Sequence, residues 1–97
     1  MYEKQGFVYI LASKPRGTLY IGVTSDLVRR VYEHKAKVSD GFTKKYKVDL
    51  LVYYEMYDLI TEALKRESNL KNWKRSWKIQ LIEDFNMYWI DLYPTLI

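Results

Sequence analysis

The most constraining feature of the sequence is the stretch 18–34, where an alternating pattern passes directly into a helical one. Over residues 18–24, Thr, Tyr and Gly alternate with Leu, Ile and Val, which is the period-two pattern of a half-buried strand. Ser25 and Asp26, both favoured at helix N-caps, then open a helix that should reach about Lys37. Its inward stripe, at helical spacing, consists of Leu27, Arg30, Val31 and His34. An arginine and the only histidine therefore lie on the face expected to be buried, which predicts a polar role there.

An apolar run precedes this stretch and should pair with it. Residues 7–12 are almost continuously apolar, as expected of a buried strand, and the Pro and Gly that follow are typical of a turn. We expect a hairpin whose loop is residues 13–16, so that Tyr9 faces Tyr20 across the two strands. The two phenols would then be neighbours on one face of the sheet.

The rest of the chain predicts one more strand and two more helices. In order, we expect a turn at 38–41, a basic and aromatic loop at 42–47, a strand at 48–57, a helix from a cap at Asp58 to about Trp73, and a helix at 75–85 that buries Trp77, Leu81 and Phe85. The aromatic tail 87–93 should pack back onto the sheet. Three strands with helices between them predict a small α/β fold in a single domain, residues 1–97.

Composition narrows the classes of partner and metal. Without cysteine, disulfides and thiolate metal sites are excluded and a cytoplasmic location is favoured; one histidine excludes a histidine-cluster zinc site. No apolar run is long enough for a membrane span. The net charge of +4 favours an anionic partner, nucleic acid first, although a merely soluble basic surface is the alternative. The candidate nucleic-acid-binding residues are Lys44, Lys45, Lys47, Lys71, Lys74 and Arg75.

The second predicted helix places a carboxylate in its apolar face. Its inward stripe is Ile60, Ala63, Leu64, Glu67 and Leu70. A carboxylate at this position must be paired, hydrogen-bonded or bound to a cation, since burying it alone would cost several kcal/mol. Two readings stay open: Glu67 binds a metal ion, or it forms an ion pair with Arg30 or a nearby lysine.

Together, the inward polar residues suit phosphodiester hydrolysis. They are Tyr9, Tyr20, Arg30, His34 and Glu67, with Asn86 as a further candidate. Glu67 could hold Mg²⁺ through its carboxylate and waters, and Arg30 could stabilise negative charge developing on a phosphate. A phenol is a poor base by itself, but next to a cation or His34 it could take a proton from an attacking water.

These residues resemble the motifs of the GIY-YIG nuclease family over nearly the whole chain, and most of all its small, stand-alone bacterial members. The similarity lies in Phe7-Val8-Tyr9, Tyr20-Ile21-Gly22, the pair Arg30 and His34, and Glu67. Phe7 stands where the family name has Gly, a position without side-chain chemistry. The resemblance implies a three-stranded antiparallel sheet flanked by helices, in the order β-β-α-β-α-α. It also implies metal-dependent DNA cleavage with a single ion, Mg²⁺ or in its place Mn²⁺.

By the same resemblance, the catalytic residues would be Tyr9, Tyr20, Arg30, His34, Glu67 as metal ligand, and Asn86. We therefore expect a DNA endonuclease of low sequence specificity, in repair or recombination. The alternative is a nucleic-acid-binding module of the same fold that is weakly catalytic or not catalytic. A third reading is an interaction protein that docks a partner through its aromatic tail or its basic tryptophan cluster.

Overall fold

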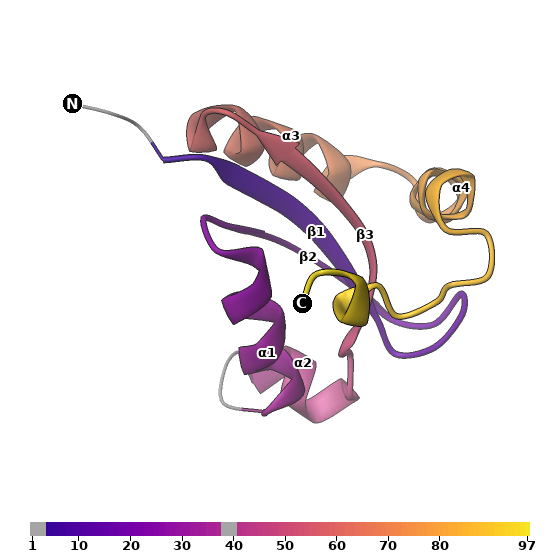
Figure 1. The fold of residues 1–97 in the computed structure, drawn as a ribbon. Helices are drawn as coiled ribbons and strands as arrows, with labels where there is room; N and C mark the ends of the chain where they lie inside the picture. The colour runs from indigo at the N-terminus through magenta and orange to yellow at the C-terminus, as the bar shows by residue number, and fades with distance from the viewer. Residues whose placement is uncertain (1–3, 38–40) are drawn as a thin grey trace.

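Three antiparallel strands form the centre of the fold, in the spatial order β2-β1-β3 (Figure 1). They are β1 (Gly6–Ala12), β2 (Leu19–Thr24) and β3 (Leu50–Tyr57). The computed structural model describes residues 4–37 and 41–97, so the turn expected at 38–41 falls, except for its last residue, outside the described residues. β1 is the central strand and is covered on both faces, which explains its continuous apolar sequence.

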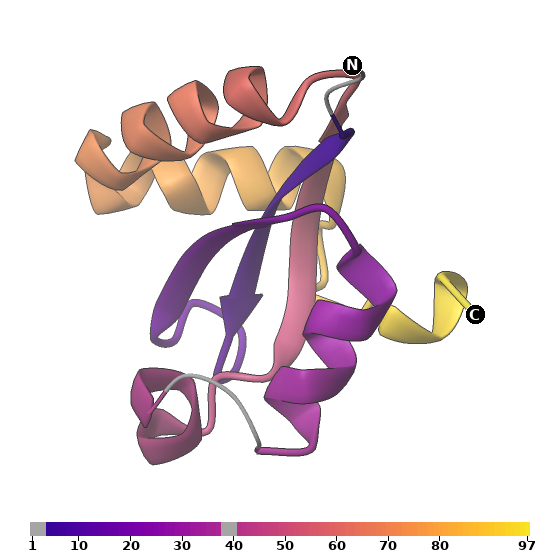
Figure 2. The same ribbon diagram turned by 90° about the vertical axis from the view of Figure 1, so that its left-hand side faces the viewer.

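Helices cover both faces of this sheet (Figure 2). On one face lie α1 (Leu27–Lys35), α2 (Gly41–Tyr46) and the C-terminal segment with its 3₁₀ turn; the other face carries α3 (Ile60–Asn72) and α4 (Arg75–Phe85). The expected α/β class, antiparallel sheet and flanking helices are confirmed, with α2 as an additional element. Within the described ranges, no helix combines the length and the apolar character needed to cross a bilayer.

The first helix has the predicted cap and the predicted phase. The Asp26 carboxylate accepts a hydrogen bond from the Arg29 backbone N–H at 3.1 Å, which satisfies one of the free donors at the helix start. Leu27, Val31 and His34 are buried. Side-chain exposure is 75% for Arg29 and 32% for Arg30, so Arg30 is the arginine on the inward side, as predicted.

The predicted hairpin register is wrong by two residues. Tyr9 pairs with Gly22, while Tyr20 pairs with Leu11. The loop is longer than expected because the Ser13 backbone N–H donates to the Thr18 carbonyl and the Ser13 hydroxyl accepts from the Thr18 N–H, both at 3.0 Å. Since side chains alternate with period two, a shift of two keeps both phenols on the same face.

The segment 42–47, expected to be a loop, forms the short helix α2. Lys47 follows it in the left-handed conformation, with φ of 55°, and the Val48 N–H donates to the Thr43 carbonyl at 3.0 Å. This is the hydrogen-bonding pattern of a Schellman motif, in which an apolar residue follows the left-handed one. The helix is too short for a periodic pattern to reveal it, and its lysines gave it the composition of a loop.

The third helix starts without the expected Asp58 cap. Leu59 occupies the N-cap and makes no side-chain cap bond; instead, the Ile60 N–H donates to the Lys4 carbonyl at 2.9 Å. Ala63 and Leu70 are buried as predicted, but Leu64 is half exposed. The apolar stripe of α3 is therefore narrower than its sequence indicates.

In α4 the predicted bounds are confirmed, and Leu81 packs against the core as predicted, but the predicted burial of the two other residues of the stripe is wrong. Trp77 and Phe85 are half exposed, and the fully buried residue is Ile82. Trp77 packs edge-on against Trp73, and Phe85 packs edge-on against tyrosines of β3, so these aromatic rings lie at the margin of the core. Aromatic residues can pack in this way while one side of the ring stays in water.

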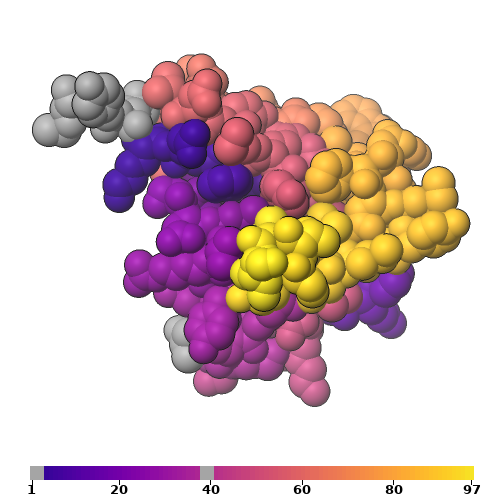
Figure 3. Space-filling model, viewed as in Figure 1, coloured from indigo at the N-terminus to yellow at the C-terminus, as the bar shows by residue number. Residues whose placement is uncertain are grey.

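The aromatic tail packs back onto the sheet, as predicted. Trp89 is buried, and the Leu92 N–H donates to the Leu51 carbonyl at 2.8 Å. Asp91 adds an ion pair with Lys35 of α1 at 2.5 Å. The C-terminal segment thus runs between α4 and α1 over the sheet, as the yellow atoms in Figure 3 show.

Candidate active site

The centre of the candidate site is the phenol of Tyr9, which lies across Gly22. These two residues face each other on β1 and β2. A Cβ at Gly22 would come within 2.5 Å of the Tyr9 hydroxyl oxygen, so the ring occupies the space that any other residue would fill. The glycine in Tyr20-Ile21-Gly22 therefore has a packing reason: it leaves room for the end of the Tyr9 ring over the edge strand.

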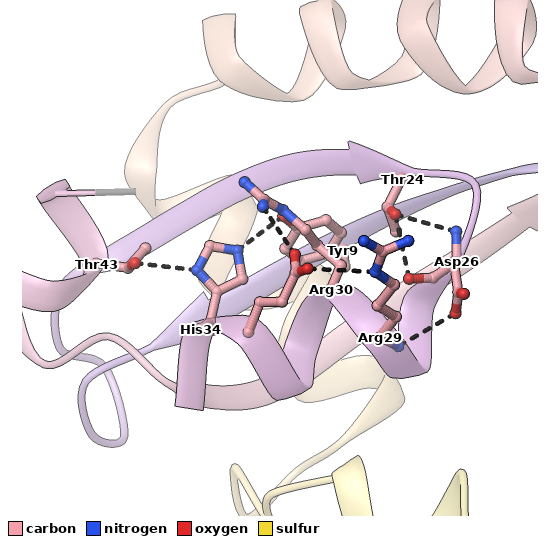
Figure 4. A network of polar contacts seen from close by, with 8 residues as sticks. Tyr9, Thr24, Asp26, Arg29, Arg30, His34 and Thr43 are labelled. Atoms are coloured by element: carbon pink, nitrogen blue, oxygen red, sulfur yellow. Dashed lines mark hydrogen bonds and ion pairs between the residues drawn. The ribbon is translucent and has the colours of Figure 1, made fainter. Parts of the chain in front are cut away.

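His34 connects the phenol to α2. Its Nε2 lies 3.0 Å from the Tyr9 hydroxyl oxygen, and its Nδ1 lies 3.0 Å from Oγ1 of Thr43 (Figure 4). All three side chains are almost fully buried. The sequence analysis missed Thr43, because the residue was assigned to the basic and aromatic loop at 42–47.

Arg30 of α1 also acts on the phenol. Burial raises the pKa of Tyr9 to about 12, and a hydrogen bond from the Arg30 guanidinium works in the opposite direction. The Arg30 Nη1 also donates to Glu33 at 3.2 Å, and Glu33 accepts from Arg29 at 3.3 Å (Figure 4). Glu33 was not among the predicted site residues, although its position three residues after Arg30 is that of a helical ion pair.

Glu67 belongs to the same electrostatic environment. Its negative charge is the weakest of the causes that raise the pKa of Tyr9, and its partner Lys71 lines the same groove as Tyr20. The Glu67 side chain is about one-fifth exposed and lies 3.4 Å from Nζ of Lys71, one helical turn further on α3. Of the two pairings left open by the sequence, the lysine partner is the one formed, while Arg30 pairs with Glu33.

The residues present fit a magnesium ion that keeps most of its waters. The described residues contain no group of three or more His, Asp or Glu side chains arranged to hold a metal. Mg²⁺ is commonly bound through one or two carboxylates, waters and substrate phosphate, and Glu67 supplies one carboxylate. Its pair with the exposed Lys71 is worth only about 0.3–0.5 kcal/mol, so it is a weak competitor for an ion.

Tyr20 links the cluster to an open groove. Its ring centroid lies 6.3 Å from Tyr9, 5.3 Å from His34 and 6.1 Å from Phe42, so the predicted neighbourhood of the two phenols is confirmed although the register is wrong. The groove, about 400 Å³ in volume, is lined by Leu19, Tyr20, Ile21, Phe42, Lys71 and Lys78. It combines an aromatic wall with ammonium groups beside the candidate metal ligand.

The candidate nucleic-acid-binding residues do not behave alike. Lys44, Lys45 and Lys47 are exposed on and just after α2. Lys74 is also exposed and lies over the Trp77 ring. Arg75 instead donates two hydrogen bonds of 2.6 Å to carbonyls of the β1–β2 loop, which holds that loop against the start of α4.

Asn86 is not brought to the site. Its side-chain amide donates to the carbonyls of Val52 and Ile90, and its oxygen accepts from the Ile90 N–H. These bonds hold the tail against β3, whereas the Tyr9 ring lies over β2 at the opposite edge of the sheet. The geometry gives Asn86 a structural role in fixing the chain that follows α4.

The fold, the buried Tyr9 and His34, and the partly buried Arg30 define an α/β domain with a polar site at the sheet edge near α1 and α3. Residues 5–80 match the GIY-YIG catalytic domain, and the chain belongs to this family of nucleases. Similar proteins include a UPF0213 protein of Staphylococcus saprophyticus, 37% identical over 78 residues, and one of Staphylococcus aureus, 40% identical over 78 residues. Each alignment covers 80% of this chain and 94% of the small bacterial relative. No solved structure matches the chain.

Proposed function

We propose that this protein is a Mg²⁺-dependent endonuclease that hydrolyses phosphodiester bonds in DNA, with Mn²⁺ able to replace Mg²⁺. The observation that carries the proposal is the convergence of Tyr9, Arg30 and His34 with the Glu67 carboxylate, from β1, α1 and α3. Membership of a family of nucleases that act on DNA supports the choice of reaction.

In this proposal, Arg30 binds the scissile phosphate. Its guanidinium presents several donors in one plane, which matches the non-bridging oxygens of a phosphate better than an ammonium group does. Because Arg30 is partly buried and held by Glu33, little reorganisation is needed as negative charge develops on those oxygens.

Tyr9 accepts the proton of the attacking water. The phenol is neutral at ordinary pH, since its pKa is raised to about 12 by burial. It can accept a proton only if its own proton leaves at the same time, and His34 Nε2 lies 3.0 Å away to receive it. The water oxygen then forms the new bond to phosphorus, and the leaving oxygen departs with the electron pair of the broken bond.

Glu67 would hold the metal ion. When bound, Mg²⁺ supplies Lewis-acid stabilisation of the leaving oxygen and of the phosphate charge. The role of Glu67 is to fix that positive charge beside Tyr9, where the carboxylate already acts on the phenol. Lys71, freed from its ion pair, would remain in the groove next to Tyr20 and add a phosphate contact.

DNA binding in this proposal is electrostatic and weakly specific. The exposed lysines lie on α2, at the end of α3 and at the start of α4. Contacts of this kind track phosphates and carry no sequence information directly. Affinity should therefore fall steeply as salt is raised, with a slope set by the number of phosphates contacted.

The decisive experiment compares the wild type with Glu67→Gln on labelled linear, branched and single-stranded DNA and on RNA, with Mg²⁺, Mn²⁺ or EDTA. Glu62→Gln, on the exposed side of the same helix, removes the same charge and serves as the control. We expect cleavage by the wild type and the control, and a loss of roughly a hundredfold or more in Glu67→Gln, since several kcal/mol of charge stabilisation disappear.

Folding separates the metal role from a structural one. Since the partner of Glu67 among the described residues is the exposed Lys71, the free energy of unfolding of Glu67→Gln in metal-free buffer should lie within about 0.5 kcal/mol of the wild-type value. Full activity in a folded Glu67→Gln protein would refute the metal assignment. Salt-sensitive DNA binding by a wild type that never cleaves would instead support the non-catalytic binding module. A role in repair or recombination and a cytoplasmic location stay predictions.

A further inference from the structure

The second ring nitrogen of His34 has a buried partner on a different element. Nδ1 lies 3.0 Å from Oγ1 of Thr43, and the exposed fractions of the two residues are 1% and 2%. Thr43 comes from α2, which the Schellman motif at Lys47 and Val48 ends one turn later. The hydroxyl is thus positioned by a short helix whose C-terminal end is fixed by the backbone hydrogen bond of this motif.

The neighbours of Tyr9 determine which way the hydrogen bonds run. The Arg30 guanidinium can only donate, and it donates to the phenol oxygen. Because that oxygen accepts from Arg30, its own O–H is available to donate to His34 Nε2 at 3.0 Å. Nε2 accepts only if it carries no proton, which requires the neutral ring to carry its proton on Nδ1.

We propose that Thr43 is a positioning residue that holds His34 as the Nδ1–H tautomer, so that Nε2 is left open to receive the proton of Tyr9. In this tautomer the Nδ1–H donates to Thr43 Oγ1, which orients the ring and satisfies a buried donor. Because a threonine hydroxyl can also donate, the tautomer is selected by the direction of the Tyr9 hydrogen bond at Nε2, and Thr43 stabilises it by accepting at Nδ1. Thr43 acts through His34 and does not touch the reacting atoms.

The catalytic consequence rests on the proposed nuclease function. As a water attacks phosphorus, its proton passes to the Tyr9 oxygen while the Tyr9 proton passes to Nε2. His34 becomes an imidazolium with a proton on each nitrogen, and its Nδ1–H still donates to Thr43. The leaving oxygen departs with its electron pair and is protonated by solvent water, so charge and protons balance.

One property of the chain makes the test direct: His34 is its only histidine. Two-bond ¹H–¹⁵N correlation spectra of uniformly labelled protein therefore report on this ring without further assignment. They are recorded at a pH above the ordinary histidine pKa, where the ring is neutral. Protonated and unprotonated ring nitrogens have well-separated shifts. The variants are Thr43→Val, which keeps the shape and removes the hydroxyl, and Thr43→Ser, which restores it. The control is Thr95→Val near the C-terminus, where the hydroxyl donates to the Leu92 carbonyl.

We expect Nδ1–H in the wild type, Thr43→Ser and Thr95→Val, and a shift toward Nε2–H in Thr43→Val. Cleavage kinetics should show kcat lowered by roughly tenfold or more in Thr43→Val with KM unchanged, and recovery in Thr43→Ser. An Nε2–H tautomer in the wild type overturns the proposal, and this measurement does not depend on the folding of any variant. An unchanged tautomer in Thr43→Val also overturns it. A wild type with the Nδ1–H tautomer but no cleavage overturns the nuclease function and leaves the positioning role of Thr43 standing.

Discussion

Replacing Gly22 by alanine tests whether the packing of Tyr9 across β2 holds the site together. The new Cβ would lie 2.5 Å from the Tyr9 hydroxyl oxygen, 2.6 Å from Cζ and 3.0 Å from Cε1. Ordinary contact begins at 3.4 Å, so the end of the ring must move by roughly 1 Å. Such a shift stretches the 3.0 Å hydrogen bond to His34 beyond bonding distance.

The expected loss of stability follows from these two effects. Overpacking a well-packed site costs about 1–3 kcal/mol, and a lost buried hydrogen bond adds about 1 kcal/mol. Gly22 does not have a positive φ, so alanine also stabilises by reducing the freedom of the unfolded chain, by about 0.5–1 kcal/mol. The free energy of unfolding should therefore fall by about 1–3.5 kcal/mol, and nuclease activity should fall with it.

The assay is urea denaturation followed by tryptophan fluorescence and far-UV circular dichroism. Gly41→Ala is the matched control, since a Cβ there meets nothing within 4 Å, and its stability should stay within about 1 kcal/mol of the wild type. A double-mutant cycle with Tyr9→Leu, which removes all three crowded atoms, should recover most of the cost of alanine at position 22. A Gly22→Ala protein as stable as the wild type would refute the reasoning. The same would follow if alanine at position 22 lowered the free energy of unfolding equally with Tyr9 and with Tyr9→Leu.

Two further predictions concern the loops and the surface. Lys47→Gly should raise the free energy of unfolding by about 0.5–1 kcal/mol, because Lys47 has a φ of 55°; an unchanged or lower urea midpoint would contradict it. Hydrogen bonds from the Arg16 guanidinium and the Trp89 indole lower the pKa of Glu83 from 4.5 to about 2, so the stabilisation from this carboxylate is present above pH 4.5 and is lost as the pH falls toward 2. Melting temperatures of Glu83→Gln should depend less on pH in this range than those of the wild type; parallel curves would mean that the pairing does not contribute.

Where the sequence predicted the site correctly, a local period decided the result. The helical spacing of Leu27, Val31 and His34 set the phase of α1 and thereby distinguished Arg30 from Arg29. The period of two in the strands placed Tyr9 and Tyr20 on one face despite a wrong loop length. A repeating pattern gives a reliable assignment because several residues together determine which face is buried, and one exception among them does not change that face.

The register of the hairpin could not be predicted in this way. It depends on the backbone of the β1–β2 loop, where Arg16 adopts the left-handed conformation with φ of 55° and the Ser13 hydroxyl accepts from Thr18. Arginine has no special preference for that conformation, so nothing in the sequence marked the position. The two registers differ by two residues and keep the same side chains on each face. Contacts within the loop therefore determine the register, and these contacts leave no periodic pattern in the sequence.

The same distinction separates the side-chain contacts that could be predicted from those that could not. Glu67 with Lys71, and Arg30 with Glu33, lie one helical turn apart, so spacing alone predicts that each pair can form. The bond between His34 and Thr43 joins α1 to α2, and its existence depends on α2 being a helix at all. Helical spacing identified the residues that bear charge and chemistry. The orientation of the imidazole, on which proton transfer depends, is set by a tertiary contact that no local pattern contains.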